Sequence, residues 1–429
     1  MTFLFLDISI WVSLKVKTKI IKQGKMMKKG MIKLSLIAGA ALFTSTAAMA
    51  GGDITPMEPM VDTEAPAKVE WKSKSVLFGF SQIGVGFGDG VIKGNQNGDY
   101  KFSADRIRLG WKYFSGPLAA KVFLDFSKDG DDKGEIGVPD VIKDAFISYK
   151  FDDAAVVKAG VIKTPVGMGF TIPGWNLDVI KRGFDKKLAF ERAFGVMVSG
   201  RDIGFGNNGK VNGLEMGHER PWKGFGYDVM VAGQTGRSGA VNNAGLGDAN
   251  AYMGRLMFDW GQELHAEVSY GVSENAGGIR DDVRAVDSED YEVFNFGIDS
   301  HFDRANLKAE YYDVQNIRGV DGWDMNTLAL TGTYYITDTL EGAVKYIGGT
   351  STKKGVDADA SNTYIGLNYY INPKSNKMDR KSRRSRNRHR LQVNYVVASG
   401  DTKEFASVGS FFKEDAILLQ YQFAFKSSL

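Results

Sequence analysis

Apolar and polar residues alternate along most of this chain with a period of two, which sends successive side chains to opposite faces of a β-strand. In 105–113, for example, the apolar Ile107 and Leu109 alternate with the cationic Arg106 and Arg108. Sixteen segments show this pattern, and no long stretch has helical periodicity. The predicted strands are 75–87, 102–114, 117–127, 142–151, 155–163, 195–206, 225–233, 250–260, 262–272, 290–302, 305–314, 324–336, 339–348, 361–371, 389–398 and 414–425.

The connections between these segments alternate in length. Tight turns are expected at 114–117, 151–154, 260–262, 302–305 and 336–339. Long polar loops are expected at 128–141, 164–194, 234–249, 273–289, 315–323, 349–360 and 399–413. Short turns opposite long loops, on an even number of strands, are typical of outer-membrane barrels, whereas a soluble β-sandwich does not require this alternation. The sequence therefore predicts an all-β fold, a sixteen-stranded antiparallel transmembrane β-barrel.

The N-terminal region has the three parts of a secretory signal peptide. Residues 27–33 are cationic, residues 34–43 are apolar, and Ala48 and Ala50 supply the small residues before a cleavage site, so we expect cleavage after Ala50. The apolar part is too short to span a bilayer as a helix. The predicted organisation is an upstream extension with a signal peptide over 1–50, a proline-rich acidic periplasmic segment over 51–71, and the barrel over 72–429.

Removal of this N-terminal region changes the sign of the net charge. The whole chain has 54 basic and 51 acidic residues, a net charge of +3. Residues 1–50 hold eight lysines and one aspartate, so 46 basic and 50 acidic residues remain, a net charge of −4. An acidic mature chain argues against nucleic-acid binding. The absence of cysteine from the sequence excludes disulfides, thiolate metal sites and cysteine nucleophiles.

Several stretches of the predicted barrel carry family-like motifs: 106–125, 144–169, 190–192 together with 201–204, and 366–373 followed by 391–396. These stretches resemble the phosphate-selective porins O and P, a family of trimeric outer-membrane porins. The resemblance implies a homotrimer in the bacterial outer membrane that passes anions. It does not align individual cations with the substrate lysines of that family, so phosphate binding is left open.

The longest connection, 164–194, is the candidate constriction loop, folded inward to narrow the lumen. Strand side chains alone do not constrict a sixteen-stranded barrel. Cations at a narrow, low-dielectric passage concentrate anions and replace part of their hydration. The alternative is that they pair with Asp178, Asp185 and Glu191 nearby. The candidate anion-binding residues of the loop and its edge are Lys181, Arg182, Lys186, Lys187, Arg192 and Arg201.

A second set of cations falls on the lumen face by alternation and would guide anions along the wall, or would simply be hydrated. This set is Arg106, Arg108, Lys112 and Lys121, with Asp125 and Asp144 beside it. A basic insertion at 374–390 falls on the periplasmic side by strand order. It is a solvated loop, a periplasmic entrance that attracts anions, or a contact to an anionic polymer of the envelope.

Enzymatic motifs are weak in this sequence. The four histidines form no metal-binding pattern, and Ser269 and His265 share the lumen face of one predicted strand. The glycine-rich 84–88 lies in a predicted strand and no helix follows it, unlike a dinucleotide-binding turn. We therefore predict no catalysis, no cofactor and no metal.

The expected function is passive diffusion of small hydrophilic solutes with a preference for anions, phosphate-like anions among them. The expected partners are those solutes, outer-membrane lipid and two further copies of the chain. Two alternatives remain: a weakly selective general porin, and a structural or adhesive surface barrel without an open pore.

Overall fold

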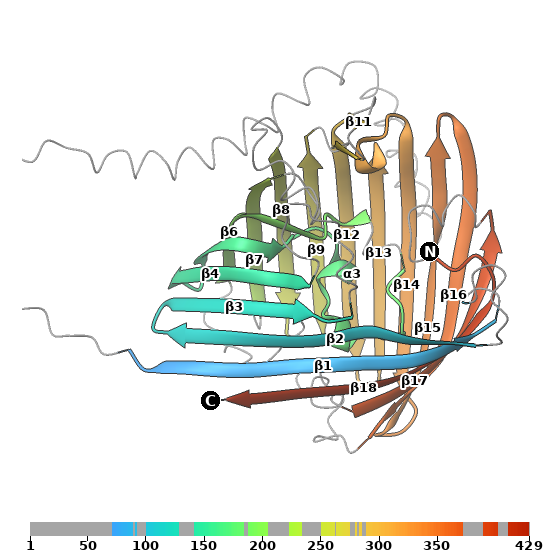
Figure 1. Cartoon of the computed structure of the whole chain (residues 1–429), viewed down its shortest axis with the longest axis horizontal. Coiled ribbons are helices and arrows are strands. Elements are labelled where there is room, and N and C mark those ends of the chain that lie inside the picture. The colour runs from blue at the N-terminus through green and yellow to red at the C-terminus, as the bar shows by residue number, and fades with distance from the viewer. Residues whose placement is uncertain are drawn as a thin grey trace, which may run out of the picture. The chain divides into compact units, whose positions relative to one another are not determined.

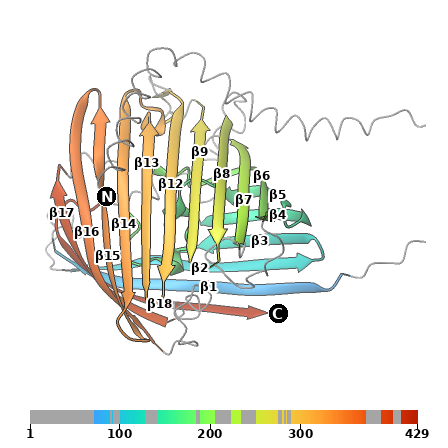
Figure 2. The same cartoon turned by 180° about the vertical axis from the view of Figure 1, so that it is seen from behind.

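The computed structural model describes residues 71–88, 91, 100–127, 141–183, 188–204, 223–233, 250–261, 263–274, 279–280, 283–284, 289–371, 389–401 and 411–428. Trp71–Leu429 forms one compact unit, a closed antiparallel β-barrel of sixteen strands (Figures 1 and 2). The first and last strands, drawn in blue and dark red, lie side by side and close the barrel. The predicted fold class is confirmed.

Each barrel strand pairs with its neighbours in chain order, apart from the pairing that closes the ring. The order is β1-β18-β17-β16-β15-β14-β13-β12-β9-β8-β7-β6-β5-β4-β3-β2, and β10 and β11 form a separate two-stranded sheet. The first half comprises β1 Ser73–Phe87, β2 Tyr100–Ser115, β3 Leu118–Asp125, β4 Ile142–Asp152, β5 Ala155–Lys163, β6 Arg192–Ile203, β7 Lys223–Gly233 and β8 Asn250–Trp260. The second half comprises β9 Leu264–Ser273, β12 Tyr291–Phe302, β13 Ala305–Gln315, β14 Trp323–Tyr335, β15 Leu340–Lys353, β16 Val356–Tyr370, β17 His389–Gly400 and β18 Ala416–Ser428. The short pair is β10 Ile279–Arg280 and β11 Val283–Arg284.

One predicted long loop is wrong. Residues 349–360 continue β15 and β16, which are joined by a turn at Lys354 and Gly355, both at positive φ. Hydroxyl groups on β15 donate across the pair, from Thr350 to Asp359 and from Thr352 to Asp357, each at 2.6 Å. Polar cross-strand pairs thus extend these two strands beyond the point at which the apolar alternation stops.

The tight turns lie where the sequence predicted them and share one end of the barrel. Trp260 and Leu264 pair in register across one of them, and Phe302 and Ala305 across another. Tyr370 and His389, which flank the basic insertion, lie at this same end. The insertion itself, apart from His389 and Arg390, falls outside the described residues.

The outer face of the barrel is apolar, as expected for a sheet that faces lipid. The inner face carries the charged and amide side chains, together with apolar side chains that form a buried cluster. On β2, the outward Ile107, Leu109 and Trp111 are each about two-fifths exposed, whereas Arg106 and Arg108 point inward. Burying such side chains in lipid supplies roughly 25 cal/mol per Å² of apolar surface removed from water. Among the described residues, none of the helices has the length and apolar character needed to cross a membrane.

The described part of the connection between β5 and β6 contains a one-turn helix, α3 Met168–Thr171, and a 3₁₀ turn, η1 Gly174–Asn176. Most of its apolar side chains are buried, and several of them form one cluster with apolar residues of the barrel strands. This cluster includes Val166, Ile180, Leu188 and Phe190 from the connection. It therefore occupies part of the lumen and leaves less room for solutes.

Candidate functional site: the constriction loop and the cationic wall

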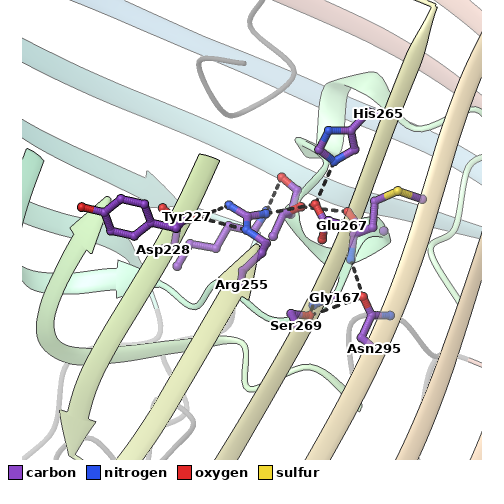
Figure 3. Close-up of polar contacts among 12 residues, drawn as sticks. Gly167, Tyr227, Asp228, Arg255, His265, Glu267, Ser269 and Asn295 are labelled. Carbon is purple, nitrogen blue, oxygen red and sulfur yellow. Dashed lines mark hydrogen bonds and ion pairs between the residues drawn. The ribbon is translucent and has the colours of Figure 1, made fainter. Parts of the chain in front are cut away.

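The connection between β5 and β6 folds inward and docks on the far wall of the barrel. We refer to residues 164–191 as the constriction loop. Its ends meet, because Lys163 and Arg192 pair in register. Three successive N–H groups at its start nevertheless reach β9, β12 and β13. Gly167 N–H donates to Ser269 Oγ (3.1 Å), Met168 N–H to Asn295 Oδ1 (3.2 Å) and Gly169 N–H to Glu310 Oε1 (2.9 Å); Figure 3 shows the first anchor.

Gly167 permits this close approach for two reasons. Its φ of 88° belongs to the left-handed region that disfavours other residues. A Cβ atom at this position would also lie 2.1 Å from the hydroxyl oxygen of Tyr312 on β13. The loop therefore turns toward the wall at a residue without a side chain.

The second half of the loop is held by a row of side chains that we call the amide clamp: the amides of Gln82, Asn368, Gln392, Asn394 and Gln422, together with the guanidinium of Arg390. They lie on β1, β16, β17 and β18. The clamp donates to the carbonyls of Gly174 (Gln82, 3.0 Å), Trp175 (Gln422, 3.1 Å), Leu177 (Arg390, 2.9 Å) and Asp178 (Asn368, 3.0 Å), and Asn394 Oδ1 accepts from Ile180 N–H at 2.7 Å. All six clamp side chains are buried. The loop backbone thus finds hydrogen-bond partners on the wall rather than in water.

The amide clamp was not predicted from the sequence, because most of its side chains are uncharged and give no electrostatic signal. The signal was present in the last strands, where Gln392 and Asn394 alternate with apolar residues, as do Gln420 and Gln422. Uncharged amides on a lumen face supply both donors and acceptors, which a docked backbone needs.

The described loop cations take different positions. The Lys181 ammonium forms an ion pair with Asp105 on β2. Arg182 is buried and donates to the carbonyls of Gly169 and Ile172 within the loop. Lys186 and Lys187 lie outside the described residues.

The two cations predicted near the loop edge are far apart along β6. Arg192 begins the strand, and its Nε lies 2.8 Å from Asp144 Oδ1. Arg201 lies at the other end of the strand, where its N–H donates to the carbonyl of Asp153 in the tight turn between β4 and β5. Its guanidinium forms an ion pair with Asp228 at 2.9 Å. Its anion-binding role remains a prediction, at a position away from the loop.

The predicted lumen-wall cations face inward together on β2 and β3. We call Arg106, Arg108, Lys112, Lys121 and Arg192 the cationic wall. Arg106 donates to Gln82, and the Lys112 ammonium lies 5.3 Å from the ring centre of Phe78. Arg108 pairs with Asp125 at 2.9 Å, and Lys121 pairs with Asp144. Asp125 also contacts Lys143, and Asp144 also contacts Arg192, so each carboxylate serves two cations.

A network of alternating charges lies along the inner face of β7 to β9 (Figure 3). Arg255 bridges Asp228 and Glu267, and His265 lies between Glu267 and Asp259, with 3.0 Å from each ring nitrogen to a carboxylate oxygen. A neutral imidazole donates from one nitrogen and an imidazolium from both. These five side chains are all buried.

The network is not arranged for nucleophilic catalysis. Ser269 accepts from Gly167 and lies near Asn295, while the His265 nitrogens face the two carboxylates. Among the described residues, no group of three or more acidic or histidine side chains is placed to hold a metal ion.

Comparison with known proteins shows the fold. No family model and no curated protein matches the sequence. The outer membrane channel DcaP of Acinetobacter baumannii has a TM-score of 0.52 at 14% identity, over 85% of this chain and 100% of that chain. The trimer form of OmpT, an outer membrane protein of Vibrio cholerae, has a TM-score of 0.54 at 12% identity, over 82% of this chain and 99% of that chain. OmpF of Salmonella typhi, in complex with daunomycin, has a TM-score of 0.54 at 12% identity, over 83% of this chain and 98% of that chain. The chain therefore shares the fold of Gram-negative outer-membrane porins, and the finer resemblance to the O and P family remains a prediction.

Proposed function

We propose that this protein is an outer-membrane porin that passes small hydrophilic solutes by passive diffusion and prefers anions. The fold that it shares with outer-membrane channels supports the passive pore. The preference for anions rests on the cationic wall and on Lys181 of the constriction loop. The trimer form of the Vibrio cholerae protein supports assembly as a homotrimer.

One observation supports the preference for anions most directly: in the ion pairs formed by Lys181, Lys121, Arg108 and Arg192, the cation is the more exposed partner. The side-chain exposures are 33% for Lys181 and 13% for Asp105, 23% for Lys121 and 5% for Asp144, 14% for Arg108 and 2% for Asp125, and 10% for Arg192 and 5% for Asp144. A solute that passes this wall therefore meets ammonium and guanidinium groups before it meets carboxylates. Such groups attract anions and repel cations in a narrow passage.

The mechanism needs no covalent step. The amide clamp holds the constriction loop in place, so the width of the passage is fixed by the fold. An anion that enters exchanges part of its hydration shell for Lys and Arg donors and leaves when thermal motion carries it to the next cation. Guanidinium groups suit carboxylates and phosphates, because they present two parallel donors.

Weak selectivity is the second candidate, because each described cation of the wall that forms an ion pair is partly neutralised by its partner. A surface barrel without an open pore is the remaining alternative. Liposome swelling in sugars separates an open pore from a closed barrel. An anion-preferring porin and a weakly selective porin both admit small sugars, whereas a closed barrel does not.

The double substitution Lys121→Gln and Lys181→Gln tests the proposed preference. Each residue is the more exposed partner of its ion pair. We expect the reversal potential in a KCl gradient to move toward potassium selectivity. The matched control is Lys223→Gln, because the Lys223 ammonium lies 4.2 Å from the outward Trp260 ring and faces away from the lumen. An unchanged potential in the double variant contradicts the assignment of these residues to the path.

A further inference from the structure

Aromatic rings underlie the cationic wall. Phe78 and Phe80 on β1 and Phe123 on β3 form an inward cluster that is separate from the main core. The rings of Phe78 and Phe123 are stacked, with 5.3 Å between their centres. Trp175 of the constriction loop meets Phe80 edge-on at 5.2 Å. The cluster thus joins the loop to the wall at the point where the cations lie.

The cations of the wall lie over these rings. The guanidinium carbon of Arg108 is 5.5 Å from the centre of Phe80 and 5.7 Å from that of Phe123. The Lys121 ammonium is 5.2 Å from the centre of Phe123 and 5.8 Å from that of Phe146 on β4. The negative ring faces attract cations, so the rings hold these groups in place.

Two aromatic side chains keep surface on the lumen side. Phe78, Phe80 and Phe123 are buried, whereas Trp175 and Phe146 are partly exposed. Trp175 belongs to the inward loop, and Phe146 pairs in register with the inward Lys121. The path through the constriction is therefore bordered by cations and by apolar aromatic surface together.

This combination fits one class of anion better than another. A small, strongly hydrated inorganic anion gains no binding energy from the face of an aromatic ring, because that face is also negative. An organic anion with a planar apolar body has two sources of binding energy. Its carboxylate contacts Arg108 or Lys121. Its apolar body contacts Trp175 or Phe146.

We propose that the constriction contains a binding site for organic carboxylates with an apolar planar body. Benzoate is the simplest probe of this class. This inference rests on the proposed anion-preferring pore and names the class of solute. Trp175 and Phe146 are its apolar contacts, and Arg108 and Lys121 hold the carboxylate. Acetate and inorganic phosphate share the charge and lack the apolar body.

Block of the chloride current through single channels in a planar bilayer tests the proposal. We expect benzoate to reduce the current at a concentration about tenfold lower than acetate or phosphate does, as expected for an added aromatic contact. Trp175→Leu is expected to raise the half-blocking concentration of benzoate by about threefold to tenfold, and that of acetate little. The chloride-to-potassium permeability ratio should stay unchanged, because the cations remain.

A second substitution and a matched control keep the test decisive. Phe146→Leu, on a different element, is expected to raise the half-blocking concentration in the same direction. Trp111→Leu removes a lipid-facing ring, 38% exposed, and is expected to leave block unchanged. Equal half-blocking concentrations of benzoate and acetate in an anion-selective wild-type channel would overturn the proposed binding site. The proposed function would not be affected. Potassium selectivity of the wild-type channel overturns the proposed function itself.

Discussion

Asp144 pairs with two cations of the cationic wall through one carboxylate, so its charge partly neutralises both. Lys121 approaches one of its oxygens, and Arg192 lies 2.8 Å from the other. The carboxylate is buried, while both cations retain more exposure. Loss of its charge would therefore release two positive groups toward the path.

We predict that Asp144→Asn increases the preference for chloride and lowers stability. Removal of one partner of a buried ion pair typically costs about 3–5 kcal/mol, because the remaining charge is left without compensation. The reversal potential in a KCl gradient and the denaturant midpoint measure the two effects. Asp338→Asn is the control, since Asp338 and Arg304 form an exposed pair at 3.7 Å, and neither quantity should change. A loss of chloride preference in Asp144→Asn would show that Lys121 and Arg192 do not face the path.

Sequence reasoning at this scale located the wall and missed the role of single loop residues. Alternation was sufficient to place Arg106, Arg108 and Lys121 on the lumen face, because side-chain direction in a strand follows from position. Arg182 is different: it contacts the carbonyls of Gly169 and Ile172, which become its neighbours only through the irregular path of the loop. No periodicity encodes such a path.

The constriction loop behaves as an element of the barrel rather than as a surface loop. Its first N–H groups bond to β9, β12 and β13, and its later carbonyls bond to β1, β16, β17 and β18. Strands distant in sequence hold it from both sides, so the complete loop site forms only in a closed barrel. The sequence predicted that the loop folds inward, and these contacts show it.

We predict that the double substitution Asn368→Ala and Asn394→Ala loosens the loop without changing the sign of ion selectivity. Asn368 donates to the carbonyl of Asp178, and Asn394 accepts from Ile180 N–H. Each lost hydrogen bond costs about 1 kcal/mol, so we expect larger fluctuations of the single-channel current. Asn306→Ala is the control, because Asn306 is also inward and buried but bonds to Asp299 and Ser300 on the wall. Equal current noise in both variants would contradict a role for the amide clamp in fixing the passage.

The period of two predicted the strands well and failed at one hairpin for a physical reason. Thr350, Thr352, Asp357 and Asp359 lie on adjacent strands and pair with one another. Their polarity resembled a loop, because apolar alternation marks a strand only where one of its faces meets lipid or core. Cross-strand hydrogen bonds maintain the same sheet beyond that region.

At the scale of the whole molecule, net charge says little about selectivity. The full chain carries +3, while the chain without residues 1–50 carries −4. Carboxylates dominate the buried network of β7 to β9, whereas at the wall the cation of each ion pair is the more exposed partner. Where each charge meets water therefore decides which ions the pore attracts.

The reversal potential of the wild-type channel in a planar bilayer, under a KCl gradient, tests the central claim most directly. The cations of the wall and Lys181, each more exposed than its acidic partner, predict the polarity that corresponds to chloride carrying more current than potassium. The opposite polarity, with potassium as the more permeant ion, would contradict the account.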